Sequence, residues 1–145
     1  MSINLAASPQ AYRESAVLTA PPERLVVMLY DGACRFLQQA AVTMRSGDVP
    51  TAHERLRRAE AIIDHLLATL DMSQGEVAQR LEAIYLFCQR HLADGRIRQD
   101  PTHLEKVREL LGELREAWAQ ISGAQPAQAG AAASAAPARG VEGTA

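Results

Sequence analysis

Four amphipathic helical patterns follow one another along this chain, with only short connections between them. The fourth is the clearest, because its apolar residues recur in alternating steps of three and four. They are Leu104, Val107, Leu111, Leu114, Trp118 and Ile121. Helices joined by short connections run antiparallel to their neighbours. No segment with strand periodicity competes, so the sequence predicts an all-α fold, an antiparallel up-down four-helix bundle.

Proline and glycine bound the first two patterns. Pro22 suits the first position of a helix, where no backbone donor is needed, and this pattern runs to Arg45. The sequence SGD at 46–48 then stops it. The second pattern runs from about Pro50 to Leu70.

Side chains that cap helices open the last two patterns. Ser73 and Glu76 fit a capping box, so we expect the third helix to begin there and to end at the sequence ADG at 93–95. Asp100 can cap the fourth helix, and Pro101 can take its first position.

Composition divides the chain into three parts. Residues 1–20 are mixed and predict a short N-terminal cap segment, while residues 21–121 carry the bundle. Residues 122–145 are rich in Ala, Gly and Pro and cannot build a core. We expect them to form a disordered C-terminal tail.

The stretch LVVMLY at 25–30 carries more apolar side chains than one core can bury. A helix turns about 100° per residue, so six successive side chains point in every direction. The pairs Ile62–Ile63 and Leu66–Leu67 and the sequence AIYLFC at 83–88 widen the apolar stripes of the next two patterns in the same way.

Two interpretations of this excess are compatible with each other. In the first, the segment AYRESAVL at 11–18 folds back and covers the excess, or the apolar pairs simply flank a large core. In the second, a partner helix lays its apolar face on the excess. The N-terminal segment is then a lid that a partner displaces.

Charge and hydropathy argue against several classes of function. A net charge of -2 gives no basic footprint for nucleic acid, and the sequence RLRRAE at 55–60 is typical of a solvated helix face. No stretch is apolar enough for stable membrane insertion. Cys34 and Cys88 lie in helical patterns, and we interpret them as reduced, packed thiols of a cytoplasmic protein.

Pairs of metal-ligating residue types occur, but each lacks a second pair. Asp100 and His103 lie three residues apart, as do Cys88 and His91. Two ligands make a weak site, and Asp100 already serves as a cap. No nucleophile elbow or phosphate-binding loop is present, so we expect no metal, no other cofactor and no enzymatic activity.

His53 raises an alternative function, since histidine-phosphotransfer proteins are four-helix bundles with an exposed histidine. Their pattern places a basic residue and then a small one after the histidine. Here Arg57 is followed by Arg58, whose bulk would crowd an approaching receiver domain.

The sequence YRESAVLTAPPERLVVMLYDGACRFLQQA at 12–40 resembles the flagellar export chaperone family FliS, which binds flagellin. LDMSQGEVAQRLEAIYLFCQRHL at 70–92 and DPTHLEKVRELLGELREAW at 100–118 are similar to the third and fourth helices of that family. The combination of TAPP, MLYDGA and LDMSQGEV is specific to it.

This resemblance implies a cytoplasmic, non-enzymatic chaperone. Its partners would be the C-terminal helical segment of flagellin, which it keeps from polymerising early, and a component of the flagellar type III export gate. No nucleotide is needed for such a role. Another secreted partner remains an alternative, and a second copy of the chain can also close an apolar surface as a homodimer.

The apolar excess supplies the candidate binding residues. We expect Tyr12, Val17 and Leu18 to cover the binding surface when it is empty. Gly32 should allow a neighbouring helix to approach closely, and Asp31 should accept a hydrogen bond at a helix contact. The candidates that line or support the surface are Leu25, Val26, Leu29, Tyr30, Ile62, Leu66 and Tyr85.

Overall fold

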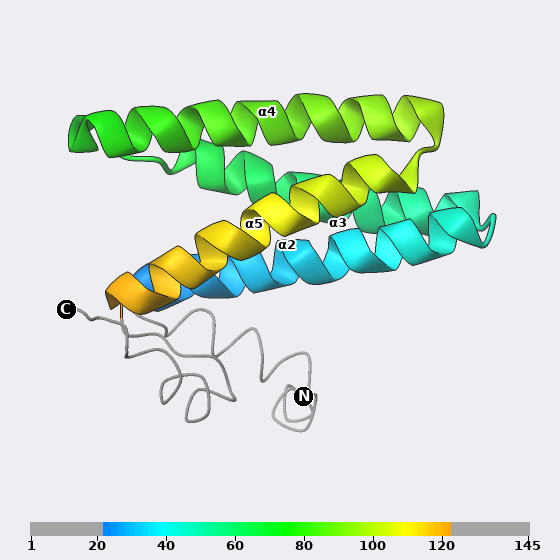
Figure 1. Cartoon of the computed structure of the whole chain (residues 1–145), viewed down its shortest axis with the longest axis horizontal. Coiled ribbons are helices and arrows are strands. Elements are labelled where there is room, and N and C mark those ends of the chain that lie inside the picture. Colours follow the sequence, from blue (N-terminus) through cyan, green and yellow to red (C-terminus); the bar gives the residue numbers. More distant parts are fainter. Residues whose placement is uncertain (1–21, 123–145) are drawn as a thin grey trace, which may run out of the picture. The chain divides into compact units, whose positions relative to one another are not determined.

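The computed structural model describes residues 22–122, and the predicted cap segment and tail therefore lie outside the described residues. Within this range the chain forms four α-helices and no strand (Figure 1). The helices are α2 (Pro22–Arg45), α3 (Val49–Ala68), α4 (Glu76–Arg98) and α5 (Pro101–Ser122), with a short 3₁₀ turn η2 (Met72–Gln74) before α4. The all-α prediction is confirmed.

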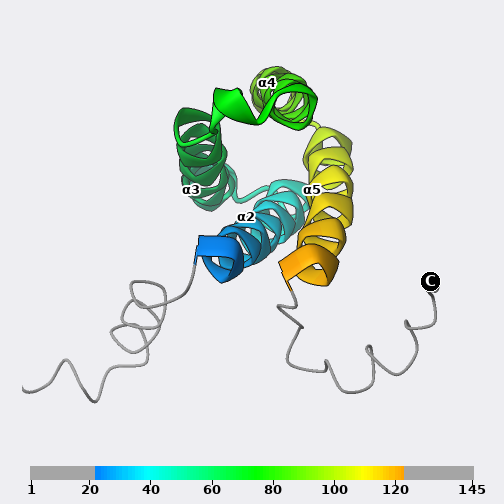
Figure 2. The ribbon, with the colours of Figure 1, turned by 90° about the vertical axis from the view of Figure 1, so that its left-hand side faces the viewer.

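These residues belong to two compact units, of which Met28–Arg115 is the larger. In this unit successive helices run antiparallel, and the end-on view in Figure 2 shows α2, α3, α4 and α5 at the corners of a four-helix bundle. Side-chain contacts join each neighbouring pair: Phe36–Arg58 for α2 and α3, Glu60–Arg96 for α3 and α4, Asp94–His103 for α4 and α5, and Arg45–Glu105 for α5 and α2.

Among the largest fully buried side chains of the larger unit, two tyrosines carry hydroxyl groups. Tyr30 of α2 is 0% exposed and Tyr85 of α4 is 2% exposed. Their Oη atoms are hydrogen-bonded to each other across the bundle. The other large, fully buried side chains are Leu37, Leu56, Ile63, Cys88, Leu92, Leu104, Val107 and Leu111.

The smaller unit contains the described residues 22–27 and 116–122. Val27 and Ala119 are buried there, and Trp118 packs against them. Ile121, the last predicted position of the apolar seam in the fourth pattern, is exposed. The prediction that Ile121 packs in the seam was wrong, since its side chain is 79% exposed in the last turn of α5.

Most predicted helix starts and ends are confirmed. Helix α2 covers the predicted range, and α3 begins at Val49, one residue before the predicted proline. Asp48 caps α3 by accepting a hydrogen bond from the Thr51 amide. Asp100 accepts one from the Thr102 amide at 3.0 Å at the start of α5.

The predicted capping box before α4 is wrong. Ser73 lies in η2, where its amide and hydroxyl both donate to Asp71 Oδ1. Gly75 precedes α4 with φ of 71°, a left-handed conformation that suits glycine, and no side chain caps the helix. The Glu76 carboxylate accepts a hydrogen bond from Arg80 instead.

The predicted end of the third helix at ADG is also wrong, because α4 continues to Arg98 and ends at Gln99 with φ of 54°. Gly95 lies inside the helix, where α5 approaches closely. A Cβ atom placed on Gly95 would lie only 2.6 Å from His103 Cβ. This glycine therefore serves helix packing and does not end the helix.

Candidate partner-binding surface

An incompletely buried apolar stripe lies where α2 meets α3. Leu29 and Phe36 of α2 and Ile62 of α3 are half-buried, and they lie around the buried Gly32. A Cβ atom on Gly32 would lie 3.3 Å from Ile62 Cδ1, so the missing side chain allows the two helices to approach. We call these four residues the α2–α3 edge.

Arginine side chains border one end of this edge. The guanidinium carbon of Arg35 lies 5.5 Å from the centre of the Phe36 ring, and that of Arg58 lies 5.8 Å from it. Arg58 also pairs with Glu54, which pairs with Arg55 at 3.1 Å. The edge is thus apolar at Leu29 and Ile62 and basic around Phe36, and Arg35 Nη2 also lies 3.8 Å from the position of a Cβ atom on Gly32.

The structure separates the predicted binding residues into two groups. Tyr30, Tyr85 and Leu66 are buried inside the bundle, where they support the helices that carry the edge. Leu29 and Ile62 are half-buried on the α2–α3 edge itself.

The other predicted residues belong to different parts of the chain. Leu25 and Val26 are half-buried in the smaller unit. Tyr12, Val17 and Leu18 lie outside the described residues. They remain predictions.

Asp31 lies at a contact between α2 and α5. Its Oδ1 accepts a hydrogen bond from Arg115 Nε at 2.8 Å, and Oδ2 accepts one from Nη2 at 3.4 Å. The Arg115 side chain is only 11% exposed. A two-point pair of this kind fixes the relative position of the helices better than one between two solvated side chains.

The sequence patterns did not single out Phe36 of α2 or Ile97 of α4. Phe36 follows Leu29 by seven residues, which places both on one face of α2. This spacing could have indicated that Phe36 belongs to the same surface as Leu29. On the exterior of α4, Leu86 and Phe87 are each 37% exposed and Ile97 is 80% exposed. The widened stripe AIYLFC did indicate the first two, and Val77 near the start of α4 is exposed as well.

The candidate metal pairs have other roles. His103 Nε2 lies 3.0 Å from Asp94 Oδ2, and His103 Nδ1 lies 3.2 Å from Asp100 Oδ2. The His91 ring stacks on His103 at 4.3 Å, while Cys88 is buried. Between residues 22 and 122, no three His, Cys, Asp or Glu side chains have an arrangement that could hold a metal ion.

The two cysteines are free thiols. Burial raises the pKa of each to about 11, and at Cys34 the Asp31 carboxylate adds to the effect. The thiolate, which is the reactive form, is therefore scarce at neutral pH. These thiols act as packing groups.

His53, the candidate phosphotransfer residue, contacts α4. Its Nε2 lies 2.7 Å from the side-chain nitrogen of Gln99, and the imidazole is half-buried. Arg57 and Arg58 are exposed on the next turn of α3. The crowding expected from Arg58 remains a prediction.

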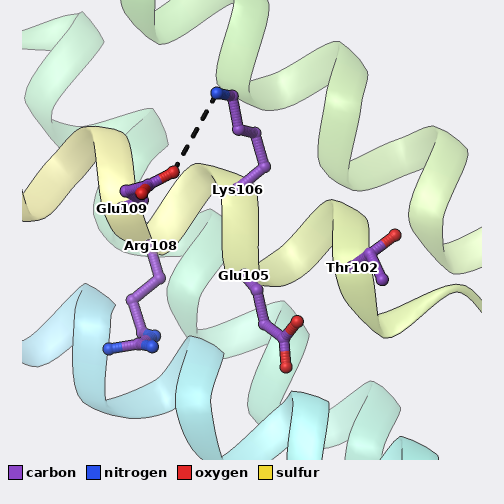
Figure 3. A pocket seen from close by; sticks show the side chains of 5 residues that line it. All are labelled: Thr102, Glu105, Lys106, Arg108 and Glu109. Atoms are coloured by element: carbon purple, nitrogen blue, oxygen red, sulfur yellow. Dashed lines mark ion pairs between the residues drawn. The ribbon is translucent and has the colours of Figure 1, made fainter.

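An open hollow on α5 is lined by polar side chains alone (Figure 3). They are Thr102, Glu105, Lys106, Arg108 and Glu109. Lys106 Nζ lies 3.9 Å from Glu109 Oε1, and Arg45 pairs with Glu105. The hollow is open and offers no apolar side chain to a partner helix, so the α2–α3 edge is the better candidate for binding.

Comparison with known proteins identifies the family. The model of the family described as flagellar protein FliS matches residues 5–125. The chain belongs to the FliS family. The flagellar secretion chaperone FliS of Salmonella typhimurium is 41% identical to it over 111 residues, which cover 75% of this chain and 82% of the relative.

Other FliS proteins are similar over the same region. That of Vibrio cholerae is 34% identical over 119 residues, covering 79% of this chain and 88% of the relative. That of Bacillus subtilis is 33% identical over 110 residues, covering 76% and 82%. Both are named flagellar secretion chaperones. In the described part of this FliS family member, no helix has the length and apolar character required to span a bilayer.

Proposed function

We propose that this chain is a cytoplasmic export chaperone that binds the C-terminal helical segment of flagellin. It would prevent premature polymerisation and deliver flagellin to the type III export gate, without enzymatic chemistry. Membership of the FliS family and the names of its relatives support the chaperone role.

The observation that carries flagellin binding is the incomplete burial of the α2–α3 edge. Leu29, Phe36 and Ile62 keep part of their surface exposed although they lie between two packed helices. A partner helix with an apolar face would remove that surface from water, and its own apolar face as well. The partner would then be protected from self-association.

The interior residues support this surface indirectly. Tyr30 and Tyr85 link α2 to α4, and the Asp31–Arg115 pair links α2 to α5. Because both contacts hold α2 in place, the edge is preorganised and a partner loses less free energy to ordering. Leu66 is buried in the interior and lies on α3, the same helix as Ile62.

The N-terminal segment completes the proposal. Tyr12, Val17 and Leu18 would cover Leu25 and Val26 in the free protein and would be displaced by flagellin. Both latter residues are half-buried. This lid is tested by deleting residues 1–20, which should speed flagellin binding without weakening it.

Titration calorimetry with flagellin tests the main proposal. We expect tight binding of full-length flagellin and none of flagellin that lacks its C-terminal segment. Equal binding of the two would contradict it. Sedimentation of the chain alone shows whether a second copy occupies the same surface.

A pair of variants locates the binding surface. Ile62→Glu places a charge on the α2–α3 edge and should weaken flagellin binding at least about tenfold, which corresponds to about 1.4 kcal/mol. Val42→Glu is the matched control, because Val42 is an exposed apolar residue of α2 elsewhere. If both variants bind like the wild type, the edge is not the site.

A further inference from the structure

The basic end of the α2–α3 edge carries more positive charge than the neighbouring carboxylate of Glu54 neutralises. We propose that Arg35 and Arg58 form, with Phe36, a subsite for a carboxylate side chain of the bound segment. This inference rests on the proposed function, since it describes the chemistry of the flagellin segment that the edge accepts.

Cations outnumber carboxylates at this place. Arg55 and Arg58 share a single carboxylate, that of Glu54. Among residues 22–122, Arg35 forms no ion pair with a carboxylate. The end of the edge therefore has excess positive charge in a chain whose net charge is -2.

The neighbouring acidic residues of α3 are turned to another helix. Glu60 pairs with Arg96, and Asp64 Oδ1 accepts a hydrogen bond from Gln89 at 2.7 Å. Both partners lie on α4. The carboxylates of Glu60 and Asp64 therefore do not neutralise the arginines on the side of α3 that faces α2.

The Phe36 ring holds both guanidinium groups near the apolar part of the edge. Each lies within 6 Å of the ring centre, a distance at which a cation is attracted to an aromatic face. Arginine presents several donors in a rigid fork, which suits a carboxylate. A guanidinium held beside a ring also loses less freedom when it binds one.

The spacing along α2 defines the partner further. Phe36 lies seven residues beyond Leu29, about 10 Å along the helix axis at 1.5 Å per residue. A helical segment lying along the edge would therefore place Asp or Glu about two turns from its apolar anchors. The edge thus favours an acidic amphipathic helix over one that is purely apolar.

Calorimetry with two synthetic segments tests the inference. One is the C-terminal segment of flagellin, and the other has its Asp and Glu residues replaced by Asn and Gln. We expect the double variant Arg35→Gln, Arg58→Gln to bind the native segment about tenfold more weakly than the wild type does. The neutral segment should bind both proteins equally weakly, and added salt should weaken native binding to the wild type most.

Arg57→Gln is the matched control, since Arg57 is an exposed arginine adjacent to Arg58 on α3. It should bind the native segment within about twofold of the wild type. Thermal unfolding confirms that each variant is folded. If the double variant or the neutral segment binds as tightly as its native counterpart, the carboxylate subsite is overturned and flagellin binding stands. If the wild type does not bind the native segment, the proposed function fails and the subsite fails with it.

Discussion

The hydroxyl groups of Tyr30 and Tyr85 are hydrogen-bonded to each other in the interior of the bundle. They come from diagonally opposite helices and are 55 residues apart in sequence. Burial raises the pKa of Tyr85, so its hydroxyl group stays protonated at physiological pH. This contact fixes the helix that carries the α2–α3 edge.

A double-mutant cycle should detect this hydrogen bond. Tyr30→Phe leaves the buried Tyr85 hydroxyl without its hydrogen-bond partner, and we expect a loss of about 1–3 kcal/mol in the free energy of unfolding. Tyr30→Phe together with Tyr85→Phe should lose less than the sum of the single variants, because the Tyr85 hydroxyl that the single variant leaves without Tyr30 is then absent. Urea denaturation measures all three; strictly additive losses would show that the hydroxyl groups do not interact energetically.

Glycine-to-alanine substitutions at three positions should change the free energy of unfolding in different directions. Gly95→Ala places its Cβ 2.6 Å from His103 Cβ, which cannot move aside without shifting the backbone, so we expect a loss of about 1–3 kcal/mol. At Gly112 nothing lies within 4 Å of the added atom. Gly112→Ala should therefore gain up to about 1 kcal/mol from helix propensity.

Gly32→Ala lies between these cases. Its Cβ meets Ile62 Cδ1, the end of a half-buried flexible side chain, at 3.3 Å. We expect stability close to that of the wild type and weaker flagellin binding, because Ile62 must turn. A thermal melting series of the three variants checks the order, and a stable Gly95→Ala protein would contradict the close approach of α4 and α5.

The two-point pair of Asp31 with Arg115 should contribute more to the stability of the fold than an exposed ion pair does. Asp31→Ala removes both acceptors of the Arg115 guanidinium, whose side chain is only 11% exposed. We expect a loss of about 1–2 kcal/mol in the free energy of unfolding. Glu76→Ala breaks a pair with Arg80 in which both side chains are about three-quarters exposed, and should change stability by less than about 0.5 kcal/mol. Equal effects in chemical denaturation would show that burial does not strengthen the first pair.

Mild acidification should destabilise the chain through His91. Burial, and next the neighbouring His103, lower the pKa of His91 below 6.5, an effect to which Lys106 adds and which Asp94 and Asp100 oppose. The unfolded chain therefore takes up this proton at higher pH than the folded chain. Stability is fully present above pH 6.5 and falls as the pH drops through that value toward the lower folded pKa.

Unfolding free energies at pH 7.5 and pH 5.5 measure this effect. The unfolding free energy of His91→Gln should fall less between pH 7.5 and pH 5.5 than that of the wild type. His65→Gln is the control, because His65 is exposed on α3 and should leave the fall unchanged. If His91→Gln loses as much unfolding free energy on acidification as the wild type does, other groups cause the pH dependence.

The helices and most of their ends could be predicted because their causes are local. The periodicity of Leu104, Val107 and Leu111, the prolines at 22 and 101, and the caps Asp48 and Asp100 all act within a few residues of themselves. The capping box failed for the same kind of reason. Asp71, two residues before Ser73, offered a nearer acceptor.

Part of the candidate site could also be predicted. The run at 25–30 indicated correctly that α2 has more apolar residues than the interior can bury, since Leu25, Val26, Met28 and Leu29 are only half-buried. Sequence could not say which residues face inward. That depends on the rotation of α2 against three other helices, which comes from contacts far apart in the chain.

The sequence by itself determined that this chain forms four amphipathic helices with surplus apolar surface, because helical periodicity and caps are properties of neighbouring residues. Only the tertiary structure decided that Tyr30 lies inside while Leu29 lies on the edge, that Gly95 serves packing, and that Arg35 and Arg58 meet at Phe36. These outcomes depend on contacts between helices, and no local pattern encodes the distance between side chains on different helices.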